Sequence, residues 1–226
     1  MSTPITRGYE VKFETIVGTG ADLRLRSLLD RQQYHDPFTE AQALGISPAQ
    51  WPLFGLLWPS ARVLANEMHS FELEGKRILE IGCGLALASL VVHRRSGDIT
   101  ASDYHPLAAA FLLENLRLNQ LPQMKYEPGD WSGTNPRLGR FDLIIGSDVL
   151  YDRGQPETLS GFIDRHSADT VEVLIADPDR GNQAGFTRMM AVLGYSHTEA
   201  RVWSLPANGG PYKGRLHNYR RGTLVN

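Results

Sequence analysis

The most informative segment of the sequence is Lys76-Arg77-Ile78-Leu79-Glu80-Ile81-Gly82-Cys83-Gly84-Leu85-Ala86. Its first half is a short apolar run that ends at Gly82, which is typical of a strand buried in a sheet. Small and apolar residues follow over 85–94 and predict a helix. A buried strand, a glycine turn and a helix in this order predict the first unit of a parallel α/β sheet.

The segments downstream continue this alternation of strands and helices. We expect further strands at 98–103, 125–127, 141–147, 171–176, 195–204 and 215–221. We expect helices at 107–119, near Pro156 and at 183–193, the last closed by Gly194. The final two strands follow each other across the turn at 208–211, which predicts an antiparallel hairpin. The rest of the pattern predicts a mostly parallel sheet with helices on both faces, and ligands at the carboxyl ends of its strands.

The N-terminal third is less regular, and we divide the chain into an arm at 1–74 and an α/β domain at 75–226. Residues 9–17 alternate like a strand, and residues 61–68 are typical of a helix. The apolar stretch at 51–59 contains two Trp-Pro pairs, which resist regular structure.

Length, charge and cysteine content exclude several classes of protein. The 226 residues suit one domain with an arm and are too few for two full catalytic domains. Cys83 is the only cysteine, so an intramolecular disulfide and a cysteine-rich metal site are excluded. The seven histidines are scattered without metal-ligand spacing, so we expect no metal centre. A formal net charge of −2 argues against a broadly basic nucleic-acid-binding protein.

The sequence shows no membrane or targeting segment. It has no apolar run long enough to span a membrane, and residues 1–10 lack the basic-then-apolar pattern of a signal peptide. We therefore expect a cytoplasmic protein without a membrane partner. We also expect a monomer, although no motif specifies the oligomeric state.

The glycine loop indicates a ligand other than a dinucleotide. The dinucleotide-binding pattern needs a third glycine at the position of Leu87, so a nicotinamide-dependent oxidoreductase is disfavoured. Glu80 stands just before the turn, where a carboxylate would repel a pyrophosphate and suit a ligand with a positively charged amine. A glycine turn between strand and helix is by itself a weak signal for a nucleotide-type ligand.

With its neighbours, this loop resembles the first motif of class I S-adenosylmethionine-dependent methyltransferases, with Ala86 in place of the usual third glycine. The resemblance implies that S-adenosylmethionine is the cofactor and that the site residues include Glu80, Gly82, Cys83, Gly84, Asp103, Tyr104, Asp130 and Trp131. In this family the carboxylate at the position of Asp103 holds the ribose hydroxyls, and the pair at 130–131 lies beside the adenine. The alternatives are that Asp103 caps the next helix and that Trp131 belongs to the core.

A second set of residues narrows the resemblance. The segment Ser147-Asp148-Val149-Leu150-Tyr151 matches the Asp-x-x-Tyr motif of the methyltransferase-like protein lysine methyltransferases, and Trp58-Pro59 resembles their upstream Trp-Pro segment. This likeness covers about residues 50–180 and implies a Rossmann-like, seven-stranded methyltransferase sheet. It also implies that Trp58 and Ser147 border the cofactor, while Asp148 and Tyr151 are the catalytic pair that faces the acceptor amine.

The sequence therefore predicts methyl transfer to a nitrogen, with a protein lysine as the expected acceptor and a protein as the expected partner. Nucleic-acid amino methyltransferases carry two prolines where this chain has Val149 and Leu150, which argues against a nucleic-acid acceptor. A small amine or another metabolite stays open as the acceptor, because the donor site would be the same. A non-catalytic cofactor-binding or interaction module is the alternative from another class, with Asp148 as a cap and Tyr151 as packing. Residues 177–180, Asp-Pro-Asp-Arg, either shape the acceptor entrance or form an ordinary turn.

Overall fold

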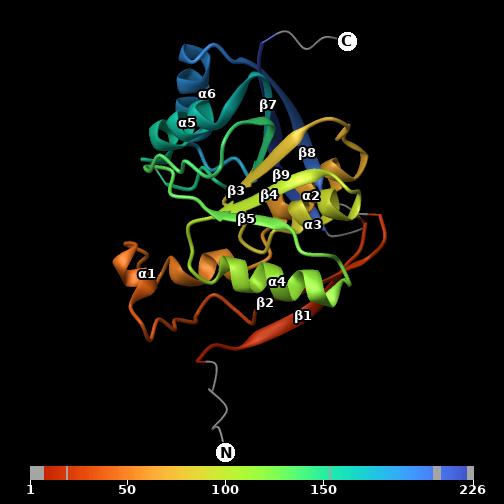
Figure 1. Ribbon diagram of the computed structural model, residues 1–226, viewed down its shortest axis with the longest axis vertical. Helices are drawn as coiled ribbons and strands as arrows, with labels where there is room; N and C mark the ends of the chain where they lie inside the picture. The colour runs from red at the N-terminus through yellow and green to blue at the C-terminus, as the bar shows by residue number, and fades with distance from the viewer. Residues whose placement is uncertain (1–7, 19, 153, 206–209, 223–226) are drawn as a thin grey trace, which may run out of the picture.

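A seven-stranded sheet forms the centre of the computed structural model, which describes residues 8–18, 20–152, 154–205 and 210–222 (Figure 1). The strands are β3 (Arg77–Ile81), β4 (Asp98–Asp103), β5 (Lys125–Pro128), β6 (Phe141–Ser147), β7 (Ser167–Asp177), β8 (Ser196–Ser204) and β9 (Pro211–Arg221). They lie in the order β5-β4-β3-β6-β7-β9-β8. The first five pair in parallel, and β9 is antiparallel to both β7 and β8. The predicted fold, a mostly parallel sheet with an antiparallel C-terminal hairpin, is confirmed.

Helices cover both faces of the sheet because the strands carry apolar side chains on both sides. Ile78 of β3 belongs to the core formed with α2 (Pro59–Ser70), α3 (Leu87–Arg94) and α4 (Ala108–Leu118). Leu79 and Ile81 of the same strand belong to the opposite core, formed with α5 (Gln155–His166) and α6 (Gln183–Val192). Figure 1 shows α5 and α6 grouped together, away from α4.

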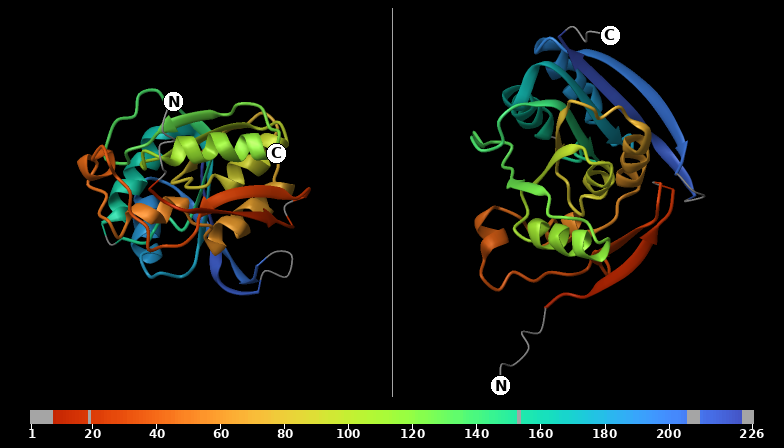
Figure 2. Two further views of the ribbon diagram at one scale, coloured as in Figure 1. Left: turned by 90° about the horizontal axis from the view of Figure 1, so that it is seen from below. Right: turned by 45° about the vertical axis from the view of Figure 1, so that its right-hand side comes forward.

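Upstream of the sheet, β1 (Val11–Ile16) and β2 (Leu23–Leu28) form an antiparallel ribbon that lies beside α4 (Figure 2). Two side chains of α4 bind the backbone of β2. Asn115 Oδ1 accepts the N–H of Arg26 at 2.7 Å, and Asn119 Oδ1 accepts the N–H of Arg24 at 2.8 Å. The strand predicted at 9–17 corresponds to β1. The prediction missed β2, although residues 23–26 alternate Leu-Arg-Leu-Arg.

Short helical segments connect this ribbon to the α/β layers. They are α1 (Glu40–Ala43) and the 3₁₀ helix η1 (Trp51–Gly55), which is the regular structure that the Trp-Pro stretch does form. Helix α2 contacts α3, β6 and β7, so the helical cover of the sheet begins upstream of residue 74. The division of the chain at residue 74 stays a prediction.

Two further expectations concern the C-terminal hairpin turn and membrane-spanning helices. Residues 208 and 209 of the expected hairpin turn lie outside the described residues. Among the helices that the structure describes, none combines the length and apolar character needed to cross a membrane.

Candidate functional site

A cavity of about 610 Å³ lies at the carboxyl ends of β3, β4 and β6. The strand order reverses between β3 and β6, which is where open α/β sheets bind their ligands. Eleven predicted site residues line this one cavity: Trp58, Gly82, Cys83, Gly84, Asp103, Tyr104, Asp130, Trp131, Ser147, Asp148 and Tyr151. The sheet thus brings together residues that are far apart in the sequence, while their binding roles stay predictions.

The glycine loop exposes its backbone to this cavity because it turns through the left-handed region. Gly82 and Gly84 have φ angles of 55° and 51°, a conformation that glycine adopts at least cost. A Cβ atom added to Gly84 would lie 2.8 Å from the carbonyl oxygen of Phe54. Ala86, which replaces the third glycine of the motif, is also left-handed, with φ 58°. The loop therefore packs against η1 closely enough to need a glycine at residue 84.

The structure pairs Glu80 with the helix that follows the glycine loop. This residue is buried and is absent from the cavity lining. Its carboxylate turns to the first turn of α3, where Oε2 accepts the backbone N–H of Ser89 at 2.8 Å and also the Ser89 hydroxyl. Burial raises the pKa of Glu80 to about 7, and the two hydrogen bonds from Ser89 oppose that rise. Glu80 thus accepts one of the N–H groups that the first turn of α3 leaves unpaired, and its role toward the cofactor stays a prediction.

Asp103 ends β4 inside the cavity and also stabilises the loop. Its Oδ2 accepts the N–H of Gly84 at 2.7 Å, and its Oδ1 accepts the N–H of His105 at 2.8 Å. Burial raises the pKa of this carboxyl, and the backbone N–H donors oppose the rise. A carboxylate has about four lone-pair sites, so Asp103 keeps acceptor capacity for ligand hydroxyls.

The wall after β4 is held by contacts from the N-terminal segment. The Tyr104 hydroxyl donates to the carbonyl oxygen of Leu44 at 2.8 Å. His105 stacks on Phe54 with ring centroids 3.7 Å apart, and burial lowers its pKa to about 3. His105 Nε2 is buried without a hydrogen-bond partner, and the residue lines the cavity. His105 is thus a candidate ligand contact that the sequence prediction missed, although it lies two residues after Asp103.

The carboxylate predicted to face the acceptor is paired with an arginine. Arg180 Nε donates to Asp148 Oδ1 and Arg180 Nη2 to Oδ2, each at 2.6 Å. The guanidinium also lies 5.8 Å from the centre of the Trp58 ring. Asp148 has a left-handed φ of 53° and donates its N–H to the carbonyl oxygen of Ala176 at 2.8 Å, so the end of β7 fixes its position. The segment 177–180 does reach the cavity, through Arg180.

Tyr151 and Trp58 also line the cavity. Burial raises the pKa of Tyr151, so its hydroxyl is protonated at neutral pH. The Trp58 indole N–H donates to the carbonyl oxygen of Leu53 at 2.9 Å, which fixes the ring against η1. The cavity lining therefore combines a bare backbone loop and the Asp103 carboxylate with the Asp148–Arg180 ion pair and the rings of Trp58 and Tyr151.

A family model described as lysine methyltransferase matches residues 53–191, more than half of the chain. The chain belongs to this lysine methyltransferase family. The match confirms the predicted family and spans both the glycine loop and the Asp-x-x-Tyr segment. It also contains Trp58 and Arg180, so the Asp148–Arg180 ion pair lies in the part that the family model covers.

The curated relatives that match this chain are named for the methylation of different side chains, lysine in two cases and histidine in a third. The chain is 33% identical over 137 residues to protein N-lysine methyltransferase METTL21A of Danio rerio, covering 55% of this chain and 62% of the relative. It is 29% identical to the electron transfer flavoprotein beta subunit lysine methyltransferase of Rattus norvegicus, covering 61% of this chain and 55% of that relative. It is 31% identical to the histidine protein methyltransferase 1 homolog of Dictyostelium discoideum, covering 49% and 38%. The chain thus spans less than two thirds of these relatives' length.

Solved structures agree with the family in fold. A methyltransferase from Pyrococcus furiosus superposes with a TM-score of 0.56 at 19% identity, covering 82% of this chain and 100% of that one. The magnesium protoporphyrin IX methyltransferase of Synechocystis with bound SAM has a TM-score of 0.53 at 18% identity, covering 72% and 78%. At such identities the likeness confirms the Rossmann-like methyltransferase fold alone.

Proposed function

We propose that this protein is an S-adenosylmethionine-dependent methyltransferase that methylates the side-chain amine of a protein lysine. The observation that carries the proposal is that the glycine loop with Asp103 and the buried Asp148 line one cavity. Methyl transfer is an in-line displacement, so the main task of the enzyme is to hold donor and acceptor close and aligned. Family membership and the lysine methyltransferases among the relatives support the enzyme class and the acceptor.

The residues of the cavity fit the proposed cofactor. A volume of about 610 Å³ is within the range of small-molecule sites. Asp103 has free lone pairs for two ribose hydroxyls, and the loop at 82–84 offers backbone without side chains in the way. When bound, S-adenosylmethionine supplies an activated methyl group on a sulfonium. The acceptor nitrogen would take the methyl group as the methyl–sulfur bond breaks with its electron pair on sulfur, and one proton would leave the amine for solvent.

Arg180 gives Asp148 a more specific task than simple attraction of a cation. The guanidinium occupies one lone pair on each oxygen of Asp148, and the remaining lone pairs can accept an N–H of the acceptor amine. A nearby positive charge lowers the pKa of an ammonium group. We therefore infer that Asp148 orients the amine while Arg180 favours its neutral, reactive form.

Calorimetry with S-adenosylhomocysteine tests the cofactor half of the proposal. Asp103→Asn should weaken binding about tenfold or more, because hydrogen bonds to a charged group are worth roughly 1.5–3 kcal/mol. Asp98→Asn is the matched control, since Asp98 lies at the other end of β4 and pairs with Lys125 on the surface. Absence of binding, or equal binding by both variants, would overturn the cofactor assignment.

Incubation with labelled methyl donor and cell lysate tests the acceptor half. Mass spectrometry that finds methylated lysine, lost in Asp148→Asn, supports the proposal. Methylated histidine or arginine would refute lysine as the acceptor, and label only in the small-molecule fraction would indicate a metabolite acceptor. Absence of label despite normal cofactor binding would indicate a non-catalytic module. The cytoplasmic location and the monomeric state stay predictions from the sequence.

A further inference from the structure

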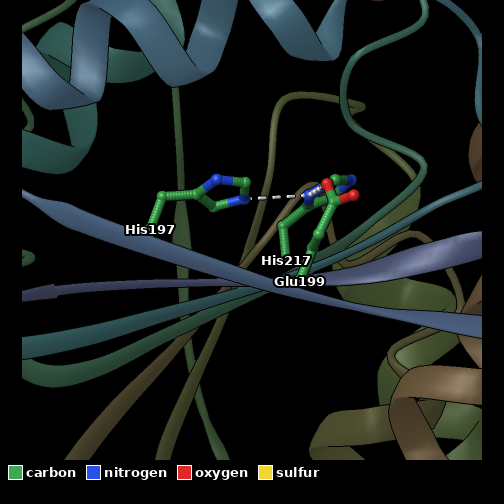
Figure 3. Close-up of side chains that lie close together, drawn as sticks. All are labelled: His197, Glu199 and His217. Atoms are coloured by element: carbon green, nitrogen blue, oxygen red, sulfur yellow. Dashed lines mark hydrogen bonds and ion pairs between the residues drawn. The ribbon is translucent and has the colours of Figure 1, made fainter.

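A second cluster of chemically active side chains lies on the C-terminal hairpin, outside the cavity. His197 and Glu199 are two residues apart on β8 and therefore share one face of the sheet. The register places Glu199 opposite His217 of β9. One donor atom from each of the three residues lies within 4.8 Å of the other two, and Figure 3 shows the three side chains on the same side of the hairpin.

The two imidazole rings are held in place by packing rather than by a ligand. His197 stacks on Tyr219 with ring centroids 4.6 Å apart, and Tyr219 in turn packs on Phe186 of α6 and shares a hydrogen bond with the Thr187 hydroxyl. His217 is fully buried. His197 Nε2 and His217 Nδ1 are 3.1 Å apart. Packing therefore holds the two ring nitrogens side by side.

The carboxylate is oriented by a neighbouring ion pair. Arg215 Nε lies 3.5 Å from Glu199 Oε1, whereas the other oxygen, Oε2, lies 3.5 Å from His217 Nδ1. Arg215 Nε also lies 3.6 Å from Asp179, which offsets its charge. With both imidazoles neutral, Glu199, Asp179 and Arg215 leave a formal charge of −1, which favours a divalent cation. Outer-shell partners that orient metal ligands in this way are common around metal sites.

We propose that His197, Glu199 and His217 bind a divalent transition-metal ion, with Zn²⁺ as the expected ion. Two imidazole nitrogens and one carboxylate oxygen are a donor set that Zn²⁺ accepts, at about 2.0–2.2 Å from each atom. Donor atoms around such a tetrahedral ion are about 3–3.7 Å apart, and the separations of 3.1 and 3.5 Å match this geometry. The ion takes the place of the hydrogen bond between the two rings.

The site is distinct from the methyltransferase cavity, because none of its three residues lines that cavity. The site is open to solvent on the side of Glu199, whose side chain is 39% exposed. The ion joins β8 to β9, and in the sheet Arg215 of β9 lies opposite Asp177 at the end of β7. Metal binding would therefore brace the strand beside the segment that carries Arg180. Sequence spacing did not predict this site, because His217 is 20 residues from His197 and only the hairpin register brings them together.

Calorimetric titration of untagged, chelator-treated protein with ZnCl₂ tests the proposal, with Co²⁺ absorption spectra as a second readout of the ligand set. We expect one ion per chain, and His197→Ala and Glu199→Gln should each weaken binding by more than about a hundredfold, the upper cost of losing an outer-shell partner. His197 is half-buried and Glu199 is exposed, so these variants should fold, and circular dichroism checks this. His69→Ala on the exposed side of α2 and Cys83→Ser are the controls and should bind Zn²⁺ normally. Absence of Zn²⁺ binding, or binding that survives both ligand variants, would overturn the site.

Discussion

The glycine loop can be tested sharply, because three positions share one backbone conformation and differ in what a side chain would meet. Gly82, Gly84 and Ala86 have φ angles of 55°, 51° and 58°. A Cβ at Gly82 would lie 3.1 Å from Val149 Cγ1, which is a side-chain atom. A Cβ at Gly84 would lie 2.8 Å from the backbone oxygen of Phe54. Alanine at Gly84 must therefore displace backbone, whereas alanine at Gly82 must displace only a methyl group.

These contacts set the expected changes in the free energy of unfolding. Alanine in the left-handed conformation costs roughly 1–2 kcal/mol, and it removes about 0.4–1 kcal/mol of entropy from the unfolded chain, so Gly82→Ala should lower stability by up to about 1.5 kcal/mol. Gly84→Ala adds an overpacking cost of roughly 1–3 kcal/mol, for a total loss of about 1–4.5 kcal/mol. Ala86→Gly should raise stability by up to about 1.5 kcal/mol, because relief of the left-handed alanine exceeds the entropy that glycine adds to the unfolded chain.

Urea unfolding followed by circular dichroism measures these three changes in stability. Calorimetry measures the affinity of each variant for S-adenosylhomocysteine. The affinity should fall further for Gly84→Ala than for Gly82→Ala, because only the former moves η1 and the loop apart. Equal losses of stability at residues 82 and 84 would refute the close approach to Phe54. A destabilised Ala86→Gly variant would refute the left-handed conformation at that residue.

Three further perturbations probe the helix cap, the ion pair and the N-terminal ribbon. The pKa of Glu80 in the folded protein is raised from 4.5 to about 7, so its stabilising effect is complete below pH 4.5 and is lost as the pH rises through 7. Relative to Glu80→Gln, the wild type should therefore lose up to about 3 kcal/mol of unfolding free energy between pH 4.5 and pH 7. Parallel curves of stability against pH for the two proteins would contradict this. Arg180→Gln should shift the pH–rate profile of methyl transfer to higher pH, because the acceptor amine would keep its proton longer; an unshifted profile with a lower rate would indicate a structural role. Asn115→Ala leaves the buried N–H of Arg26 without its acceptor and should lower the free energy of unfolding by about 1–3 kcal/mol, with faster hydrogen exchange at that amide. Asn119→Ala, at the exposed end of the ribbon, should lower it less.

The fold could be predicted because each sheet strand carries its signal locally. Runs such as Ile78–Ile81 are apolar on both faces and end at a glycine or an aspartate, so both strand and ligand edge are readable from the sequence. The ribbon strand β2 was missed although it alternates, and its burial depends on side chains of α4, which lies about ninety residues further along the chain. Such burial is a tertiary property that no short window of sequence contains.

The candidate site was predictable to the same extent, since motif residues at strand ends meet at one edge of a parallel sheet. The pairing of Glu80 with Ser89 was not predicted, because a position before the turn does not determine the direction of the side chain. The partner of Asp148 was missed because Arg180 is 32 residues away and approaches from the end of the neighbouring strand. Charge pairing across strands depends on register, and register is fixed by packing rather than by spacing.

In the proposed reaction, the pairing with Arg180 changes what Asp148 can do. A lone carboxylate at residue 148 would attract a lysine ammonium and raise its pKa, which improves binding but keeps the amine in its unreactive form. Arg180 offsets this by placing a guanidinium 2.6 Å from the same two oxygens. Asp177 is buried nearby, with one carboxylate oxygen unpartnered, so these three side chains together keep a formal charge of −1. The end of the cavity can therefore attract a cationic side chain from solvent and still favour loss of its proton beside Arg180. On this reasoning Arg180→Gln should lower KM and kcat together, because ground-state binding of the ammonium improves as the reactive amine becomes rarer.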